Sequence, residues 1–561
     1  VNDIGNIDPN FGTSVSISAD GRILAAGIPK YNVGNENVGL IATGEIVSSS
    51  SWIGSANDKD YHASANWEGS VIPDEYYDIT IPDNAKIDVS KDIEFHNMTI
   101  DAGASIISND SVSVVGPITF KRSLPDNQWY LISSPVFGQK IDDFVDTNNL
   151  ETSTDGTLSA LGSFDTENNQ WVYYNNTSLN EDILNPMQGY SIKLDESVSV
   201  KDITFKGMFY DNDINVNLTS DDERYYLVGN SYLSYIKLSD LFNAFDDSNN
   251  DNPNRIELEK TIWLWNGNTD SYDTKNLATI EGNNDFLIAP GQGFFVKTKE
   301  LGENEESISI NISNEMLTHN TVGDGDTFQR SASTPKINIT LSNNEESRDT
   351  DIYYLEGSTT SWDNGYDSTM FGGTTNDFAI YTHLVSDSDG RNLAIQSLPS
   401  NNYENMVIPV GINAISTTSI TISATINNFP AETNFYLEDK QNNSFTLLSE
   451  DSNYKTSLDS DLNGIGRFYI HTTSAALSSD NFSGNNNLSI YTTSKENLRI
   501  VGVQNGTARL KLYNNIGKEV LKTSFKGNGV NDITLHNLKT GVYILKLTTE
   551  LKTTSKKLIL E

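Results

Sequence analysis

The sequence contains no cysteine in its 561 residues. Thiolate metal sites, cysteine nucleophiles and disulfide bonds are therefore excluded. The six histidines are scattered over separate predicted domains, and no His-Glu-x-x-His motif of zinc proteases is present. The Gly-x-Ser-x-Gly motif that holds the nucleophile of many serine hydrolases is missing as well. These absences predict a protein that is not an enzyme, although a carboxylate pair for glycoside hydrolysis stays open as an alternative, because 76 acidic residues offer many pairs.

Basic residues are scarce: 37 Lys and Arg stand against 76 Asp and Glu, and the formal net charge is −39. Nucleic-acid phosphates and anionic lipids bind basic surfaces, so neither is an expected partner. Long apolar runs are also missing. Residues 542–547 form one of the longest, and a membrane-spanning helix needs about 20 apolar residues. We therefore expect no transmembrane segment.

The absence of cysteine has two interpretations. A secreted chain gains by carrying no free thiol, whereas a cytosolic chain can lose cysteine by chance. The acidic composition, rich in Asn, Ser and Thr, favours secretion. The chain opens at Val1 without a signal peptide. We expect either that a targeting segment has been removed or that the sequence is a fragment of a longer protein.

The abundant feature is the alternation of apolar and polar residues. Segments 14–17, 508–513 and 544–547 show the period of two that is typical of half-buried strands. Helical patterns are best at 237–245 and 142–145. The sequence therefore predicts the all-β fold class, with tandem β-sandwich modules.

Residues 1–45 predict a hairpin in which Asp20-Gly21 forms the turn. With Phe11-Gly12 before it, this unit resembles an FG-GAP repeat, the blade of integrin-type β-propellers. One hairpin cannot close a propeller of about four to eight blades. The resemblance implies either that further blades precede Val1 or that the hairpin packs on another part of the chain.

Residues 46–122 predict a small stack of strands, marked by Ile-Thr-Ile at 79–81 and Met-Thr-Ile at 98–100. Trp52 and Trp67 fall in this segment. Tryptophan in such a position is more typical of a core than of a sugar-binding platform.

An internal repeat follows, with residues 123–213 and 214–330 as two copies of one β module. Three pairs of segments align: 129–135 with 225–231, 171–173 with 263–265, and 186–190 with 290–294. In both copies Gln-Gly precedes an aromatic strand. We expect the glycine to let another strand approach closely and the glutamine amide to close a turn.

The rest of the chain predicts a β-sandwich at 331–477, a polar linker at 478–487 and a compact unit at 488–561. The last unit contains Leu-Tyr-Asn-Asn-Ile-Gly-Lys at 512–518, Gly-Val-Tyr at 541–543 and Lys-Lys-Leu-Ile-Leu at 556–560. This combination resembles the type A C-terminal sorting domain of the type IX secretion system of Bacteroidetes.

The resemblance implies an Ig-like sandwich that crosses the periplasm and passes through a large translocon barrel in the outer membrane. It implies a smaller shuttle barrel as the next partner and a sortase that removes the domain. The protein would then be secreted or held at the cell surface. The residues expected to carry recognition are Gly541, Val542, Tyr543, Lys556, Lys557, Leu558, Ile559 and Leu560. Alternatively, the lysines only protect an edge strand against aggregation.

Calcium is the one cofactor candidate. Asp459, Asp461 and Asn463 stand in an Asp-x-Asp-x-Asn-Gly pattern, in which alternate oxygens face one ion. The bidentate Glu of an EF-hand is absent, because Ile470 occupies its position. A second segment, 247–251, has a similar spacing without the glycine. The alternative for both is ordinary turn chemistry of Asp and Asn.

Together these observations predict a secreted, non-enzymatic protein whose upstream modules act as spacers or as an adhesin in gliding or attachment. The alternative is the stalk of a larger secreted enzyme or glycan-binding protein whose head lies upstream of Val1. Surface glycans would be further partners if the aromatic side chains of Trp171, Trp263 or Trp265 were exposed.

Overall fold

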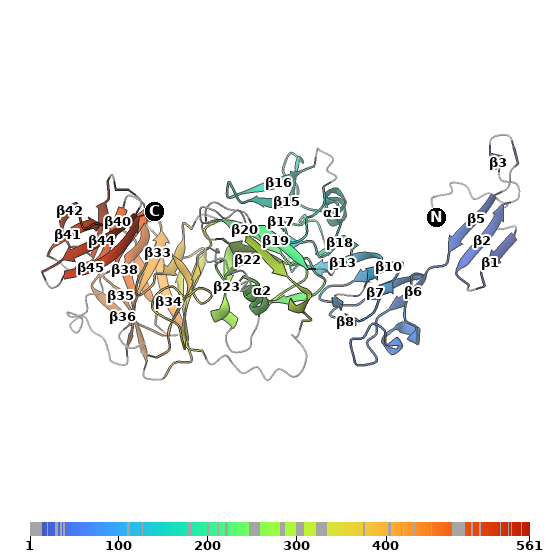
Figure 1. Cartoon of the computed structure of the whole chain (residues 1–561), viewed down its shortest axis with the longest axis horizontal. Helices are drawn as coiled ribbons and strands as arrows, with labels where there is room; N and C mark the ends of the chain where they lie inside the picture. Colours follow the sequence, from blue (N-terminus) through green and yellow to red (C-terminus); the bar gives the residue numbers. More distant parts are fainter. Residues whose placement is uncertain are drawn as a thin grey trace. The chain divides into compact units, whose positions relative to one another are not determined.

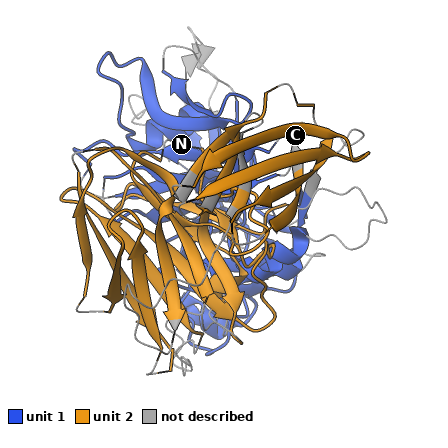
Figure 2. Cartoon of the chain, turned by 90° about the vertical axis from the view of Figure 1, so that its left-hand side faces the viewer, with its two compact units in different colours: residues 1–256, 286–326 blue, residues 257–285, 327–561 orange. Residues whose placement is uncertain are grey.

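The computed structural model of the chain consists mainly of β-strands, which confirms the all-β fold class (Figure 1). It forms two compact units (Figure 2). The first comprises Val1–Ile256 and Phe286–Asp326, and the second comprises Glu257–Asp285 and Thr327–Glu561. The residues that the structure describes are 14–19, 21–28, 32–33, 36–37, 40–108, 113–125, 127–176, 182–198, 201–210, 213–218, 223–245, 258–280, 286–298, 308–320, 334–373, 376–401, 406–416, 418–430, 433–449, 452–473, 489–494, 497–503, 506–527, 529–536, 538–539, 541–550 and 553–560.

The hairpin expected near the N-terminus is present, and β1 pairs with β2 in antiparallel orientation. The N–H of Gly21 donates to the carbonyl oxygen of Ser18 at 2.9 Å, and its φ of +79° suits glycine. β5 pairs with the other edge of β2. The FG-GAP resemblance stays a prediction. The strands here are β1 (Ser14–Ile17), β2 (Ile23–Ile28), β3 (Asn32–Val33), β4 (Glu36–Asn37) and β5 (Leu40–Glu45).

The next segment is a parallel β-solenoid, in which each turn of the chain stacks on the one before. Ile79, Met98 and Ile118 lie side by side on neighbouring strands, 19 and 20 residues apart, and all three are buried. Parallel pairs also join β8 to β11 and β9 to β12. The elements are β6 (Ser48–Ser51), η1 (Ser64–Asn66), η2 (Glu68–Ser70), β7 (Tyr77–Ile81), β8 (Lys86–Val89), β9 (Ile93–Glu94), β10 (Asn97–Ile100), β11 (Ser105–Ser108), β12 (Val114–Val115) and β13 (Pro117–Ser123).

The tryptophans of the solenoid are core residues, as expected. Trp67 is fully buried, and its ring meets that of Trp52 edge-on with the centroids 5.3 Å apart. Its indole N–H donates to the carbonyl oxygen of Tyr61 at 2.7 Å. Neither ring offers a sugar platform.

Both copies of the internal repeat contain a strand, a helix, a hairpin and a closing strand in that order. The helices lie where the sequence predicted them, although α1 is longer than the expected 142–145. Copy 1 has β14 (Tyr130–Ser133), α1 (Ile141–Asn148), β15 (Leu158–Asp165), β16 (Gln170–Asn175), β17 (Gly189–Ile192) and β18 (Asp202–Met208). Copy 2 has β19 (Ile214–Leu218), β20 (Tyr225–Gly229), β21 (Tyr235–Lys237), α2 (Leu238–Phe245), β22 (Ile262–Asn266), β23 (Ser271–Lys275), η3 (Leu277–Ile280), β24 (Leu287–Ile288), β25 (Gly293–Lys297), β26 (Ile308–Ile312), η4 (Asn314–Met316) and β27 (Leu317–Thr318).

The hairpins of the two copies match at a different register from the one predicted. Phe164 lies opposite Trp171 in copy 1, and Trp265 lies opposite Tyr272 in copy 2, so equivalent residues are 101 positions apart. Both pairs also meet edge-on, with centroids 5.3 and 5.1 Å apart. The alignment of 171–173 with 263–265 was therefore wrong. It matched similar aromatic triplets, whereas the turn of each hairpin sets its register.

In the first unit, the Gln-Gly segments of the two copies contact each other's first strand reciprocally. Gln292 bridges to Ile132, and Gln188 bridges to the equivalent Val228. A Cβ on Gly293 would lie 2.8 Å from the carbonyl oxygen of Ile132, which confirms the expected close approach. The side-chain oxygen of Gln292 accepts the N–H of Ala289 at 2.9 Å and closes a turn, as expected.

In the second unit, one continuous sheet curls over a main core, and a smaller buried cluster that includes Tyr381 and Tyr469 is separate from it. Its order is β36-β35-β38-β33-β31-β32-β29-β28-β34-β37, and β30 pairs with β32. Ile339, Ile408 and Phe468 from separate strands share the core, which confirms the sandwich character predicted here. The strands are β28 (Lys336–Ser342), β29 (Ser347–Leu355), β30 (Ser368–Thr369), β31 (Ala379–Thr382), β32 (Leu393–Pro399), β33 (Met406–Ala414), β34 (Ser419–Asn427), β35 (Asn434–Asp439), β36 (Ser444–Leu448), β37 (Tyr454–Ser457) and β38 (Leu462–Thr473).

The C-terminal part is a separate sandwich with its own core. Two sheets, in the orders β39-β40-β43 and β42-β41-β44-β45, enclose Leu498, Leu510 and Leu545. The strands are β39 (Ser489–Ser494), β40 (Asn497–Val503), β41 (Thr507–Asn514), β42 (Glu519–Lys526), β43 (Gly529–Thr534), β44 (Gly541–Thr548) and β45 (Thr553–Leu560).

Candidate functional site

The hairpin β22–β23 is fastened to the sandwich of the second unit by the loop 362–369. The side-chain oxygen of Asn364 accepts the N–H of Lys260 at 3.2 Å, and its amide donates to the carbonyl oxygen of Leu258 at 3.2 Å. The indole N–H of Trp263 donates to the carbonyl oxygen of Thr369 at 3.1 Å, and this side chain is fully buried. Trp263 is therefore a core residue and offers no platform for a sugar.

A buried carboxylate lies at the end of this loop. Asp367 is fully buried, and its two oxygens accept the backbone N–H groups of Ser397 and Asp363, each at 2.7 Å. Burial raises the pKa of Asp367 to about 7, although the two hydrogen bonds oppose the shift. The nearby carboxylates of Asp363 and Glu259 raise it further.

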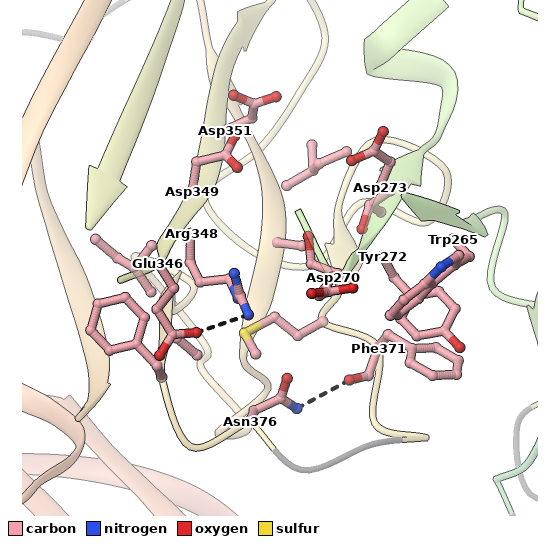
Figure 3. Close-up of a pocket in the computed structure, with 18 of the residues that line it drawn as sticks. Trp265, Asp270, Tyr272, Asp273, Glu346, Arg348, Asp349, Asp351, Phe371 and Asn376 are labelled. Carbon is pink, nitrogen blue, oxygen red and sulfur yellow. Dashed lines mark hydrogen bonds and ion pairs between the residues drawn. The ribbon is translucent and has the colours of Figure 1, made fainter. Parts of the chain in front are cut away.

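A cavity of about 520 Å³ opens where this hairpin meets β29 and residues 370–371 and 376–380 (Figure 3). Aromatic rings from the hairpin and from these residues form one wall. The ring of Tyr272 lies between the others, with its centroid 5.1 Å from that of Trp265 and 4.0 Å from that of Phe371. Phe371 is buried, whereas Trp265 and Tyr272 are partly exposed.

Carboxylates form much of the rest of the cavity wall. Asp349 and Asp351 stand on the same face of β29, and Asp273 comes from β23 (Figure 3). The amide of Asn338 donates to Asp349 at 2.6 Å and to Asp351 at 2.8 Å. Lys336 pairs with Asp351 at 2.7 Å.

The charges of this wall repel one another. The carboxylate of Asp349 is reachable by solvent, but the surrounding protein partly desolvates it and raises its pKa. The charges of Asp351 and Asp273 raise the pKa further, while the amide of Asn338 and the charge of Lys336 oppose the rise. The cavity therefore has a surplus of negative charge beside an aromatic wall.

Trp265 was predicted from the sequence as a candidate for glycan binding, whereas the carboxylates of the cavity were not predicted. The feature that could have revealed them is the spacing of Asp349 and Asp351, because residues two positions apart in a strand lie on the same face. Asp273 comes from a hairpin far away in the sequence, so no local pattern connects it to them.

The structure also assembles a Ser–His–Asp arrangement that the sequence analysis did not foresee. Nδ1 of His319 lies 2.6 Å from the hydroxyl of Ser105, and Nε2 lies 2.9 Å from the carboxylate of Asp88. These contacts form because the segment after β27 packs on the solenoid. Ser105 is fully buried, however, so a substrate does not reach its hydroxyl.

The residues of the calcium candidate are all exposed. Asp459 and Asp461 precede β38, and Asn463 belongs to it, opposite Asn413. Asp461 accepts the N–H of Ser416 at 2.6 Å, which lowers its pKa. In the part of the chain that the structure describes, no group of His, Asp and Glu side chains is placed to hold a metal ion. Calcium stays a prediction, and the segment 247–251 lies outside the described residues.

The expected recognition residues of the C-terminal sandwich take different positions. Gly541 opens β44 with a φ of +153°, and Val542 is exposed. Tyr543 is buried, and its hydroxyl donates to the carbonyl oxygen of Lys539 at 2.6 Å. Tyr543 therefore stabilises the entry into β44 from within the core.

The last strand, β45, lies at the edge of its sheet and pairs with β44. Lys557 is exposed, whereas Leu558 belongs to the core. Burial lowers the pKa of Lys556, and the carboxylates of Asp387 and Asp389 oppose this shift. Lys556 therefore lies near the preceding sandwich and is less accessible than expected. Ile559 and Leu560 belong to β45, and their side chains lie outside the described residues.

A family model described as "Domain of unknown function (DUF8693)" matches residues 86–471, which is more than half of the chain. The chain belongs to the DUF8693 family. A second model, described as "Secretion system C-terminal sorting domain", matches residues 485–561. No curated protein matches the chain. Among solved structures it is similar to "Biofilm associated protein - BSP domain", with 11% identity, a TM-score of 0.15, and coverage of 78% of this chain and 91% of that one.

The DUF8693 match begins in the solenoid and ends in β38, so it contains every residue of the aromatic and acidic cavity. The match to the sorting domain begins at residue 485, 14 positions after the last residue of the DUF8693 match. This domain marks the protein as a substrate of the type IX secretion system that is secreted or displayed on the cell surface. Within the described residues, no helix is both long enough and apolar enough to traverse a bilayer.

Proposed function

We propose that this protein is a non-enzymatic surface or secreted protein, whose modules upstream of the sorting domain act as spacers or as an adhesin in attachment or gliding. The observation that carries the proposal is the C-terminal sandwich, which matches the sorting domain and follows a series of β modules. Such modules build length and surface, and the sorting domain provides the route to the cell exterior.

The non-enzymatic part of the proposal is supported by the burial of Ser105. Its contact with His319 resembles half of a catalytic triad, but a nucleophile must be reachable by its substrate. The hydrogen bonds that His319 forms with Ser105 and Asp88 instead hold the segment after β27 against the solenoid.

The proposed partners of the C-terminal sandwich are the translocon barrel, the shuttle barrel and a sortase. The edge strand β45 has backbone groups on its outer side that suit pairing with a partner strand. Lys557 adds an exposed positive charge to this edge. On a chain of net charge −39, a local cation favours an acidic receptor rim.

Deletion of residues 488–561 tests the export route. We expect the truncated protein to stay inside the cell, and we expect a fluorescent reporter that carries 488–561 to reach the cell surface or the medium. Fractionation and immunoblotting measure both. A truncated chain that still reaches the medium would contradict the proposal.

The edge-strand proposal predicts that Lys557→Ala lowers the exported fraction several-fold, because it removes a charge from β45. Lys526→Ala is the matched control, since Lys526 is exposed on β42, at the opposite edge of the same sheet. If both variants are exported equally, Lys557 does not contribute to recognition and only protects the edge strand against aggregation.

A second function is favoured by the cavity beside Trp265, whose aromatic and acidic walls suit a glycan. In that case the chain is a glycan-binding protein, or the stalk of a larger secreted enzyme or glycan-binding protein. A precursor much heavier than 61.9 kDa would favour a stalk. A glycan array on the purified chain would test direct binding.

A further inference from the structure

The cavity beside Trp265 is lined by more acidic side chains than its basic lining residues can neutralise. Its basic lining residues are Lys275 and Arg348, and Arg348 is paired with Glu346 at 3.0 Å. The acidic residues of its lining are Asp270, Asp273, Glu346, Asp349, Asp351 and Asp377.

Asp273 and Asp349 have amide partners rather than cations. The side-chain amide of Asn266 lies 3.2–3.3 Å from the carboxylate oxygens of Asp273, and Asn338 donates to Asp349. Among the described residues neither carboxylate forms an ion pair, because the nearby Lys336 is engaged by Asp351. A cation that enters the cavity would therefore relieve repulsion between carboxylates that already face one another.

The cation that suits this cavity is organic rather than a metal ion. In the described parts of the chain, acidic and histidine side chains form no cluster close enough for metal coordination. The acids are instead spread around the cavity: Asp349 and Asp351 lie on β29, across from the rings of Trp265 and Tyr272, while Asp273 follows Tyr272 on β23 (Figure 3). A ligand that fits both walls has a flat apolar face for the rings and an ammonium group for the carboxylates.

We propose that this cavity binds an amino sugar, with a pyranose ring packed on Trp265 and Tyr272 and its protonated amine facing Asp273 and Asp349. The cavity volume of about 520 Å³ accommodates one or two sugar rings. The biological setting of this inference rests on the proposed surface role. The affinity for the amino sugar, however, is a property of the folded chain and does not depend on export.

Calorimetric titration of the purified full chain tests the site. The probe is a glucosamine hexamer, and the comparison probe is the N-acetylglucosamine hexamer, which has the same rings without the charge. We expect the glucosamine hexamer to bind at least about tenfold more tightly, because one charge-assisted hydrogen bond contributes about that factor. Its affinity should fall as salt is raised.

The double variant Asp273→Asn/Asp349→Asn should bind the glucosamine hexamer with an affinity at least about tenfold lower than that of the wild type. Its matched control is Glu167→Gln/Glu196→Gln, which removes the same charge from exposed positions outside the cavity and should leave the affinity unchanged. A second variant, Tyr272→Ala, should weaken binding by loss of the aromatic wall. Unchanged circular dichroism and melting temperature show that each variant is folded.

Three outcomes would overturn the proposal: equal affinity for both hexamers, no binding of either, or binding of pentalysine while the glucosamine hexamer fails. The first indicates a site for neutral sugars and the third a site for basic peptides. All are measured on purified protein. A failure of the export experiments therefore leaves this result intact, and a failure here leaves the export route intact.

Discussion

At the scale of single residues, Asp367 is a fully buried carboxylate within the loop 362–369 that holds β22–β23. Its pKa of about 7 in the folded protein lies well above the value of about 3.9 in an unfolded chain. The folded state therefore holds a proton more tightly than the unfolded state between pH 4 and 7. The stabilisation that comes from the raised pKa of Asp367 is fully present below pH 4 and is lost as the pH rises to 7.

Asp367→Asn should remove this pH dependence, since the amide does not titrate. The difference in unfolding free energy between wild type and variant should fall by up to about 4 kcal/mol from pH 4 to pH 7.5. Melting temperatures of both proteins at matched pH values measure the trend. A difference that stays constant across this range would show that Asp367 does not titrate there.

The calcium hypothesis is also decided by single residues. If an ion binds Asp459, Asp461 and Asn463, millimolar calcium should raise the melting temperature of the wild type but not that of Asp461→Asn. An unchanged melting temperature of the wild type would reject calcium at this site. The exposure of all three side chains and the extended backbone at Asn463 in β38 argue against a loop that wraps around an ion.

Trp263 and Trp265 show what a sequence reveals about a site and what it does not. Trp263 and Trp265 alternate with Leu264 in β22, so both rings lie on one face of the strand. Which ring is covered depends on the loop 362–369, about a hundred residues away. The contact between Trp263 and Thr369 decides it, and no local pattern reports that contact.

At the scale of elements, strand alternation and the apolar face of α2 were sufficient to place many strands and both expected helices. Strand pairing was harder to foresee. The solenoid was read as a small stack of strands, although its spacing of 19 and 20 residues was present in the sequence. The turns of this solenoid are short and share little sequence identity. Only buried apolar positions such as Ile79, Met98 and Ile118 recur from one turn to the next.

The reciprocal contact between the repeat copies depends on glycine. Gly293→Ala should destabilise the first unit by about 1–3 kcal/mol, because the new Cβ would meet the backbone of Ile132. Gly44→Ala is the matched control in a strand, since a Cβ there meets nothing within 4 Å. Chemical unfolding of both variants measures the effect. Equal stability of the two would show that β14 and β25 can move apart at little cost.

At the scale of the whole molecule, the sandwich at 334–473 and the sorting domain have separate cores that share no residue. The contacts between them are peripheral, such as Arg499 beside Gly464. Removal of 485–561 should therefore leave the DUF8693 part folded. Calorimetry should show the loss of one transition, with the others shifted by only a few degrees. Collapse of all transitions would show that the sorting domain is part of the fold of its neighbour.

The paired contacts of Gln188 with Val228 and of Gln292 with Ile132 have the form of a symmetric homodimer, in which each partner uses the same patch. Duplication of an ancestral module that once associated with itself would leave this trace within a single polypeptide. Once joined, the halves no longer had to stay identical. The equivalent hairpins now differ: one carries Phe164 and Trp171, while the other carries Trp265 and Tyr272, which form a wall of the cavity.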